Sequence, residues 1–179
     1  MNKAVFLDRD GVLNRGVIRS GRPFAPLGLE DLDILPGVPD ALEALRAAGF
    51  LLIVVTNQPD VARGLAKREQ VDAIHAFMRD RLSIDEIRVC YHDDADHCVC
   101  RKPSPGMIYA AAVERAVQLD RSFMVGDRWR DVGAAKRAGC TAILVNALPE
   151  ETRIEPDIEL SDLPAAAAWI LSRSEPDWT

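Results

Sequence analysis

The sequence predicts an α/β protein with a mostly parallel sheet and helices on both faces. Short apolar runs rich in β-branched residues alternate with segments whose apolar residues recur at helical spacing. The strand-like runs are apolar throughout, which is typical of parallel strands that helices cover on both sides. The 179 residues are enough to bury a substantial core, so we expect a single domain over residues 1–179.

The first half of the chain begins with an apolar run at residues 4–7, which predicts a short buried strand before an acidic turn. Residues 15–32 are rich in Gly, Pro and Arg and show no helical or strand period. We interpret them as a structured loop over the site, with a plain surface connection as the alternative. The next predicted elements are a helix at 38–48 that ends before Gly49, a strand at 50–55, an amphipathic helix at 67–82 and a strand at 87–91.

The second half of the chain continues this alternation. Residues 146–157 are polar and contain two prolines, so they predict a loop, and we expect residues 172–179 to be frayed. The remaining predicted elements are a helix at 107–118, a strand at 123–125, a helix that ends at Ala138, a strand at 141–145, an edge strand at 158–160 and a closing helix at 163–171.

The charge and hydropathy of the chain limit the classes of partner. The formal net charge is -6 at pH 7, which argues against broad nucleic-acid binding because phosphate contacts need a basic surface. No apolar run reaches the length of a membrane span, and the N-terminus passes into a strand without the apolar region of a signal peptide. We therefore expect a cytoplasmic protein with no membrane partner.

An acidic turn follows the first predicted strand. Asp8 and Asp10 lie two residues apart, directly before Gly11. Ligands of parallel α/β sheets bind at the carboxyl ends of the strands, so this turn lies at the mouth of a candidate site. Two acids so close together repel each other and attract a cation, and hard oxygen ligands suit Mg²⁺. The alternative is a solvated turn without a ligand.

Polar residues at other strand ends and in one loop complete a chemically coherent set. Magnesium-dependent phosphoryl transfer uses acids, a lysine and a hydroxyl, because the cation and the lysine balance the charge of the phosphoryl oxygens. One carboxylate can act as nucleophile and a second as general acid and base. The members of this set are Asp8, Asp10, Thr56, Asn57, Lys102 and Asp127.

A cysteine cluster indicates a second metal site. Cys90, Cys98 and Cys100 lie close together in the sequence, which in a cytosolic chain points to metal or redox chemistry before disulfides. With His92 they form two short pairs of soft or borderline ligands, which suit tetrahedral Zn²⁺ in a closed, structural site. His97 is a competing fourth ligand, and a loop with free thiols is the alternative.

In combination, these motifs resemble the four motifs of the haloacid dehalogenase superfamily, in the same order and over most of the chain. The resemblance implies a three-layer Rossmann-like fold with a small zinc-binding loop at 90–100 and no large cap domain. Shorter matches are similar to the heptose 1,7-bisphosphate phosphatases and to their relatives, the histidinol-phosphate phosphatases. The matching segments are Asp8-x-Asp10-Gly11-Val12, an apolar run before Thr56-Asn57-Gln58, residues 62–64, Cys100-Arg101-Lys102-Pro103 and Gly126-Asp127-x3-Asp131.

The resemblance implies roles for the matched acids. Asp8 would be the nucleophile, and Asp10 would protonate the leaving oxygen and then activate water. Mg²⁺ would be held by the Asp8 carboxylate, the Asp10 backbone carbonyl and Asp127. Asp131 would either orient Lys102 or begin a helix, where an acid suits the helix dipole.

Further roles follow from the same resemblance. The family spacing favours His92 over His97 as the fourth zinc ligand, and the zinc site would pin the loop that carries Arg101 and Lys102. The transferring phosphoryl group would be stabilised by Thr56 and Lys102, and the substrate would be bound by Asn57, Gln58, Arg101 and Arg128.

The implied function is a Mg²⁺-dependent phosphomonoesterase that acts through an aspartyl-phosphate on a small phosphorylated sugar. The expected reaction is removal of the 7-phosphate of D-glycero-D-manno-heptose 1,7-bisphosphate by a monomer. Alternatives are a histidinol-phosphate or other sugar-phosphate phosphatase, a polynucleotide 3′-phosphatase, which the acidic balance disfavours, and a zinc-stabilised binding module. Pro59 and Asp60 stand where those relatives have Ser-Gly, so the reaction class follows more directly than the substrate.

Overall fold

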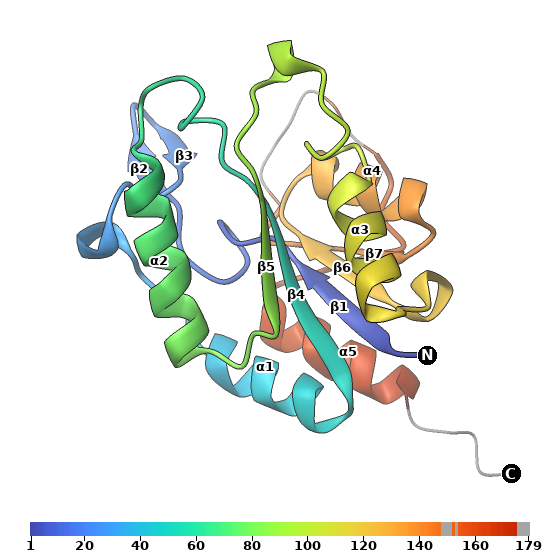
Figure 1. The fold of residues 1–179 in the computed structure, drawn as a ribbon. Coiled ribbons are helices and arrows are strands. Elements are labelled where there is room, and N and C mark those ends of the chain that lie inside the picture. Colours follow the sequence, from blue (N-terminus) through green and yellow to red (C-terminus); the bar gives the residue numbers. More distant parts are fainter. Residues whose placement is uncertain (148–151, 153, 175–179) are drawn as a thin grey trace, which may run out of the picture.

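A computed structural model describes residues 1–147, 152 and 154–174 of the chain. Its main feature is a six-stranded sheet in the order β5-β4-β1-β6-β7-β8, in which every neighbouring pair is parallel (Figure 1). The strands are β1 (Lys3–Leu7), β4 (Phe50–Asn57), β5 (Glu86–Cys90), β6 (Phe123–Gly126), β7 (Thr141–Val145) and β8 (Ile158–Leu160). This confirms the predicted α/β class with a parallel sheet.

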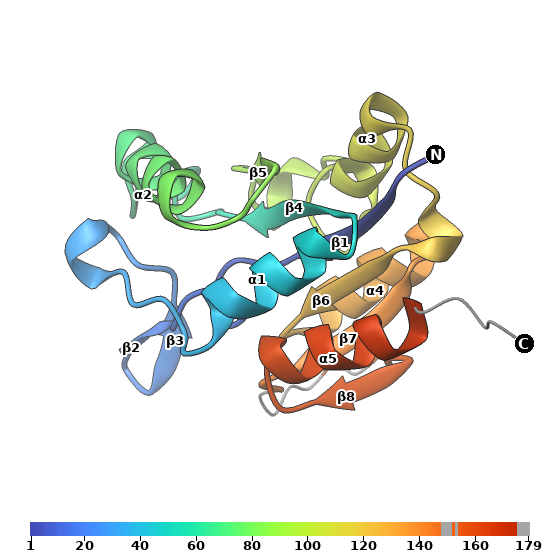
Figure 2. The same cartoon turned by 90° about the horizontal axis from the view of Figure 1, so that it is seen from below.

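Helices cover both faces of the sheet, so the molecule has three layers (Figure 2). One apolar core joins the sheet to α1 (Val38–Ala47), α2 (Arg68–Arg81) and α5 (Leu163–Ser174). A second core on the other face joins it to α3 (Gly106–Arg115) and α4 (Trp129–Ala138). The strands contribute to both cores because their side chains alternate between the two faces, which explains their uniformly apolar sequences.

The structure differs from the predictions in two segments. Residues 15–32 contain a two-stranded hairpin, β2 (Val17–Arg19) and β3 (Arg22–Phe24), and a short 3₁₀ helix, η1 (Leu29–Asp31). Strands of three residues are too short to show a period. Helix α5 runs to Ser174, further than the predicted end at residue 171. Two predictions fall partly outside the described residues: the frayed tail at 175–179, and the 146–157 loop at 148–151 and 153.

The sheet order brings distant parts of the sequence to one edge. Strand β1 lies between β4 and β6, and Leu7 pairs with Val54 on one side and Val125 on the other. The residues that follow these three strands therefore converge at their carboxyl ends, as expected for a parallel α/β sheet. None of the described helices is long and apolar enough to cross a membrane.

Candidate functional site

The three central strand ends meet around two glycines that permit very close packing. Gly11 has φ +86°, and a Cβ there would lie 2.1 Å from Asp127 Oδ2. A Cβ at Gly126 would lie 2.1 Å from the Cβ of Asp131. Only glycine allows the backbone and a neighbouring aspartate side chain to approach so closely, so the close packing of Asp127 and Asp131 depends on these two glycines.

Lys102 links two of the acids. Its Nζ donates to Asp8 Oδ1 at 2.8 Å and to Asp131 Oδ1 at 2.6 Å, and all three side chains are nearly buried. Burial alone would lower the pKa of Lys102, but the carboxylates of Asp131 and Asp8 outweigh it and keep the ammonium charged. Asp131 also accepts a hydrogen bond from the backbone N–H of Arg128 at 3.1 Å. It therefore has both of its suggested contacts, orienting Lys102 and capping α4.

A cluster of carboxylates fits a divalent cation. Asp8, Asp127 and Asp131 place carboxylate oxygens within 4.8 Å of one another. Asp127 Oδ1 is buried and has no hydrogen-bond partner among the residues that the structure describes. Burial raises the pKa of Asp8 to about 6, and burial together with Asp8 raises the pKa of Asp127 well above its usual range. Such groups are stabilised by a bound cation, and oxygen ligands suit Mg²⁺.

The Asp10 side chain has different surroundings. It accepts hydrogen bonds from Arg9, from Asn14 Nδ2 at 3.0 Å and from Gln58 Nε2 at 2.8 Å. Burial would raise the pKa of Asp10, but Arg9 and these amides hold it below its usual range. Asp10 is thus held as a carboxylate beside the Asp8 cluster, and only its backbone carbonyl was predicted to bind the metal.

The end of β4 and the residue that follows it support the site. Thr56 is fully buried, and its Oγ1 accepts a hydrogen bond from Gln58 Nε2 at 2.9 Å. Asn57 binds the backbone of Lys102 twice, donating to its carbonyl and accepting from its N–H, both at 3.0 Å. Asn57 therefore fixes the backbone that presents the Lys102 ammonium.

A cleft of about 850 Å³ opens above the acids. Its lining includes Asp8, Asp10, Asn57, Gln58, Arg101, Lys102, Asp127 and Arg128, and so most of the predicted site residues, whereas Thr56 lies beneath it. The hairpin β2–β3 forms another part of the wall, through residues such as Ile18 and Phe24. The predicted 15–32 loop over the site is thus present as an apolar wall.

A pair of arginines lies at the mouth of the cleft. Arg101 Nε donates to Asp94 Oδ1 at 2.9 Å, and Arg130 Nη1 donates to the same oxygen at 3.0 Å. Arg130 Nη1 also lies 3.4 Å from the carbonyl oxygen of Lys102. One carboxylate therefore holds two guanidiniums, and the group keeps a net positive charge suited to a phosphate.

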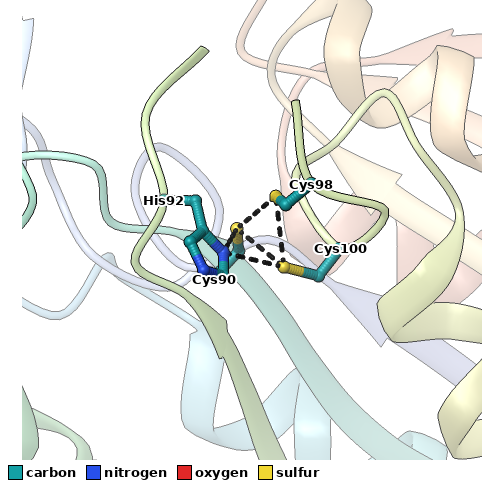
Figure 3. A group of neighbouring side chains, drawn as sticks. All are labelled: Cys90, His92, Cys98 and Cys100. Atoms are coloured by element: carbon teal, nitrogen blue, oxygen red, sulfur yellow. Dashed lines mark hydrogen bonds between the residues drawn. The ribbon is translucent and has the colours of Figure 1, made fainter. Parts of the chain in front are cut away.

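The four predicted zinc ligands meet at one point (Figure 3). The sulfur atoms of Cys90, Cys98 and Cys100 lie 3.1–3.6 Å apart, and His92 Nδ1 lies 3.3 Å from Cys100 Sγ. A tetrahedral Zn²⁺ with Zn–S bonds of about 2.3 Å needs ligand separations of about 3.8 Å, so small shifts would accommodate it. His97, the competing ligand, is not in this cluster.

The cysteine cluster is connected to the cleft through its own loop. The backbone N–H of Arg101 donates to Cys98 Sγ at 3.4 Å, and Asp94 lies on η2 (Asp94–Asp96), between His92 and Cys98 in the sequence. Arg63 ties this loop to the segment after β4 by donating to Asp93 at 2.9 Å. A metal at the cysteines would therefore hold the segment that carries Arg101 and Lys102.

Sequence reasoning missed four residues that contact the site. Arg9 and His75 are buried next to Asp10, and Asp94 and Arg130 bind each other at the cleft. A lone histidine in an amphipathic helix gives no sign of its partner, and arginines in loops usually indicate a solvated surface. The one available signal was Arg9 itself, a charged residue between two acids at the end of a buried strand.

Comparisons with known proteins agree with this geometry. The family model described as HAD-hydrolase-like matches residues 99–165. A D-glycero-beta-D-manno-heptose-1,7-bisphosphate 7-phosphatase from Rhodopseudomonas palustris is 41% identical over 148 residues, covering 76% of this chain and 79% of that protein. A D-glycero-D-manno-heptose-1,7-bisphosphate 7-phosphatase from Thermosynechococcus vestitus is 35% identical and covers 97% of both chains.

A solved structure has a similar fold over nearly the whole length. It is the D,D-heptose 1,7-bisphosphate phosphatase from B. bronchiseptica in complex with magnesium and phosphate. Its TM-score is 0.79 at 34% identity, and the match covers 96% of this chain and 99% of that one.

Proposed function

This chain belongs to the haloacid dehalogenase-like hydrolases, in the family of the heptose-1,7-bisphosphate 7-phosphatases, and from this premise we propose that it removes the 7-phosphate of D-glycero-D-manno-heptose 1,7-bisphosphate. The observation that carries the proposal is the buried group of Asp8, Lys102 and Asp131 beside Asp127, whose Oδ1 has no hydrogen-bond partner among the described residues. This arrangement has a nucleophile, a fixed cation and a metal-binding oxygen at the base of one cleft.

Asp8 is the proposed nucleophile. One of its carboxylate oxygens attacks the phosphorus atom, a P–O bond to Asp8 forms, and the P–O bond to the sugar breaks. Lys102 holds Asp8 at 2.8 Å and supplies positive charge where the phosphoryl oxygens lie. The Asn57 contacts to the Lys102 backbone keep this ammonium in place. Thr56, at the end of β4, is proposed to help stabilise the phosphoryl group.

Asp10 is the proposed general acid and base. In the ligand-free chain Asp10 is ionised. Because a phosphate dianion brings further negative charge beside it, we propose that Asp10 takes up a proton together with the substrate. Asp10 gives this proton to the leaving sugar oxygen. In the second step it accepts a proton from the water that attacks the aspartyl-phosphate, which releases inorganic phosphate and restores Asp8.

Two metals complete the proposal. Mg²⁺, bound by Asp8, Asp127 and the Asp10 carbonyl, would neutralise charge on the transferring phosphoryl group. Zn²⁺ at Cys90, His92, Cys98 and Cys100 would be structural, since four protein ligands leave no open position.

The remaining proposals concern substrate binding, cellular location and oligomeric state. Arg101 and Arg128 line the cleft and are proposed to bind the part of the substrate distant from the reacting phosphate. The cleft is open and large enough for a sugar bisphosphate, which the apolar hairpin wall would contact along its carbon skeleton. We further propose that the protein acts as a cytoplasmic monomer.

The test is phosphate release with Mg²⁺ from a panel of substrates. The panel comprises both anomers of heptose 1,7-bisphosphate, fructose 1,6-bisphosphate, histidinol phosphate and a 3′-phosphorylated oligonucleotide. We expect the highest kcat/KM for a heptose anomer. A preference for histidinol phosphate or the oligonucleotide would contradict the substrate assignment, and no turnover of any member would contradict the enzymatic reading in favour of a binding module.

A further inference from the structure

Two buried residues beneath Asp10 are not used by the mechanism above. Arg9 is fully buried and His75, on α2, is 2% exposed. Arg9 Nη1 lies 2.9 Å from His75 Nε2. Burying a guanidinium is costly unless its donors are hydrogen-bonded, so both of its partners matter to the arrangement.

The chemistry of arginine determines the direction of this hydrogen bond. A guanidinium has only donors, so Nε2 of His75 accepts, and the proton of the neutral ring lies on Nδ1. Burial, together with the neighbouring Arg9, lowers the pKa of His75 to about 4. The ring is therefore neutral near pH 7 and able to accept.

The other edge of the same guanidinium binds Asp10. Arg9 Nη2 lies 3.1 Å from Asp10 Oδ1 and 3.0 Å from Oδ2, and Arg9 Nε lies 3.2 Å from Oδ1. This planar fork fixes the rotation of the carboxylate as well as its position. A continuous path of hydrogen bonds therefore runs from α2 through Arg9 to Asp10.

We propose that His75 is a positioning residue for the general acid: by accepting a hydrogen bond from Arg9, it holds the guanidinium that orients the Asp10 carboxylate toward the leaving oxygen. The inference rests on the proposed function, in which Asp10 supplies that proton. Without the acceptor, Arg9 Nη1 is a buried donor without its partner, and the guanidinium rotates toward another oxygen. Asp10 then loses the geometry that proton transfer requires.

The test exploits the leaving group. A sugar oxygen needs a proton as it departs, whereas p-nitrophenolate is stable without one. Since kcat/KM covers steps up to departure of the leaving group, His75→Leu should lower kcat/KM for heptose 1,7-bisphosphate by about 10- to 100-fold. For p-nitrophenyl phosphate the loss should be at most about threefold, because general acid catalysis contributes little there.

Two further variants control the experiment. His75→Gln keeps an oxygen that can accept from Arg9 and should stay within about threefold of the wild type on both substrates. Arg81→Gln changes an exposed residue at the end of the same helix and should leave both activities unchanged. If His75→Leu does not fold, as judged by circular dichroism and thermal melting, His75→Met takes its place.

Three results would overturn the inference. Equal losses on the two substrates would assign His75 a purely structural role. A loss in His75→Gln as large as in His75→Leu, with both variants folded, would exclude the acceptor as the cause. If the wild type hydrolyses p-nitrophenyl phosphate but not heptose 1,7-bisphosphate, the substrate proposal fails while the inference about His75 is still open to test. The comparison is then repeated with fructose 1,6-bisphosphate as the sugar substrate. Equal losses on fructose 1,6-bisphosphate and p-nitrophenyl phosphate are the third result that would overturn the inference.

Discussion

The aspartate cluster and the cysteine cluster are two candidate metal sites built on opposite principles. Asp8, Asp127 and Asp131 offer hard oxygen atoms at the base of a cleft, and Asp8 and Asp127 face its interior. The cysteine cluster offers sulfur and imidazole ligands from the end of β5 and the loop that follows it. An open oxygen site suits Mg²⁺ and a substrate phosphate, and a closed sulfur site suits Zn²⁺ and stability.

The two clusters also differ in the pKa values of their side chains. Burial raises the pKa of Asp8 to about 6, and the neighbouring carboxylates of Asp131 and Asp10 add to this rise. At the cysteines, burial raises the pKa of the Cys90 thiol, whereas hydrogen bonds from Cys100 and the Arg101 N–H outweigh burial at Cys98 and lower its pKa to about 7. The oxygen cluster is therefore suited to reaction in an open cleft, and the sulfur cluster is suited to holding a loop in place.

The largest effect is expected from a change at Asp8, the proposed nucleophile. Asp8→Asn should lower kcat by about 10⁴-fold or more, because the amide cannot form the aspartyl-phosphate. The fold should persist, since the change removes one of three mutually repelling carboxylates. Steady-state phosphate release and a thermal melt on the same sample would check both parts. Activity within about tenfold of the wild type would refute the covalent mechanism.

Removing zinc should act on stability first. A metal present at a thousandfold excess over its Kd stabilises a fold by about 4 kcal/mol. At about 2–4 °C per kcal/mol for a chain of this size, a zinc-selective chelator should lower Tm by about 8–16 °C. Metal analysis must confirm that zinc is lost, and Mg²⁺ is then restored before the melt. An unchanged Tm would argue against a structural zinc site.

A matched pair of cysteine variants tests the zinc ligands through the zinc content of the protein. Cys100→Ser removes a ligand of the cluster, whereas Cys140→Ala removes a buried thiol outside it. Zinc content should fall in the first variant and remain unchanged in the second.

His75, beside the aspartate region, should contribute to the loss of unfolding free energy at acid pH. Its pKa is about 4 in the folded chain and 6.5 when unfolded, so the unfolded state binds more protons between these values. The full stability is present above pH 6.5 and is lost as pH falls toward 4. Between pH 7.5 and 4.5 the wild type should therefore lose about 2–3 kcal/mol more unfolding free energy than His75→Gln. Denaturant titrations at the two pH values measure this difference, and parallel losses in both proteins would refute it.

The smallest expected effect lies where the two regions meet. Asp94 belongs to the loop between zinc ligands and holds Arg101 and Arg130 at the cleft. Asp94→Asn should raise KM for a sugar bisphosphate by about tenfold, because a neutral amide orders two guanidiniums less well than a carboxylate. Asp80→Asn, an exposed acid on α2, is the matched control. A lower KM in Asp94→Asn would show instead that the carboxylate competes with substrate.

Much of the fold and of the reacting groups could be predicted from the sequence alone. Apolar runs and helical periods determine local structure because burial of one face depends on residue spacing, so the strands at 141–145 and 158–160 match β7 and β8. Asp8 and Asp127 were expected at strand ends, where the topology of a parallel sheet brings them together, and Lys102 was expected in a loop near them. The cysteine cluster was also predictable, because its ligands are close in the sequence.

Only the tertiary structure decided which distant side chains pair. His75 and Arg9 are 66 residues apart, and Arg130 and Asp94 are 36 apart, so no local pattern connects them. The hairpin β2–β3 likewise has strands too short to carry a period, and it is held by strand pairing together with contacts of Arg19 to the Phe24 ring and to Asp31. Local propensity acts over a few residues, whereas the contacts that orient Asp10 and hold the arginine pair depend on how α2, α4 and the zinc loop pack against the sheet.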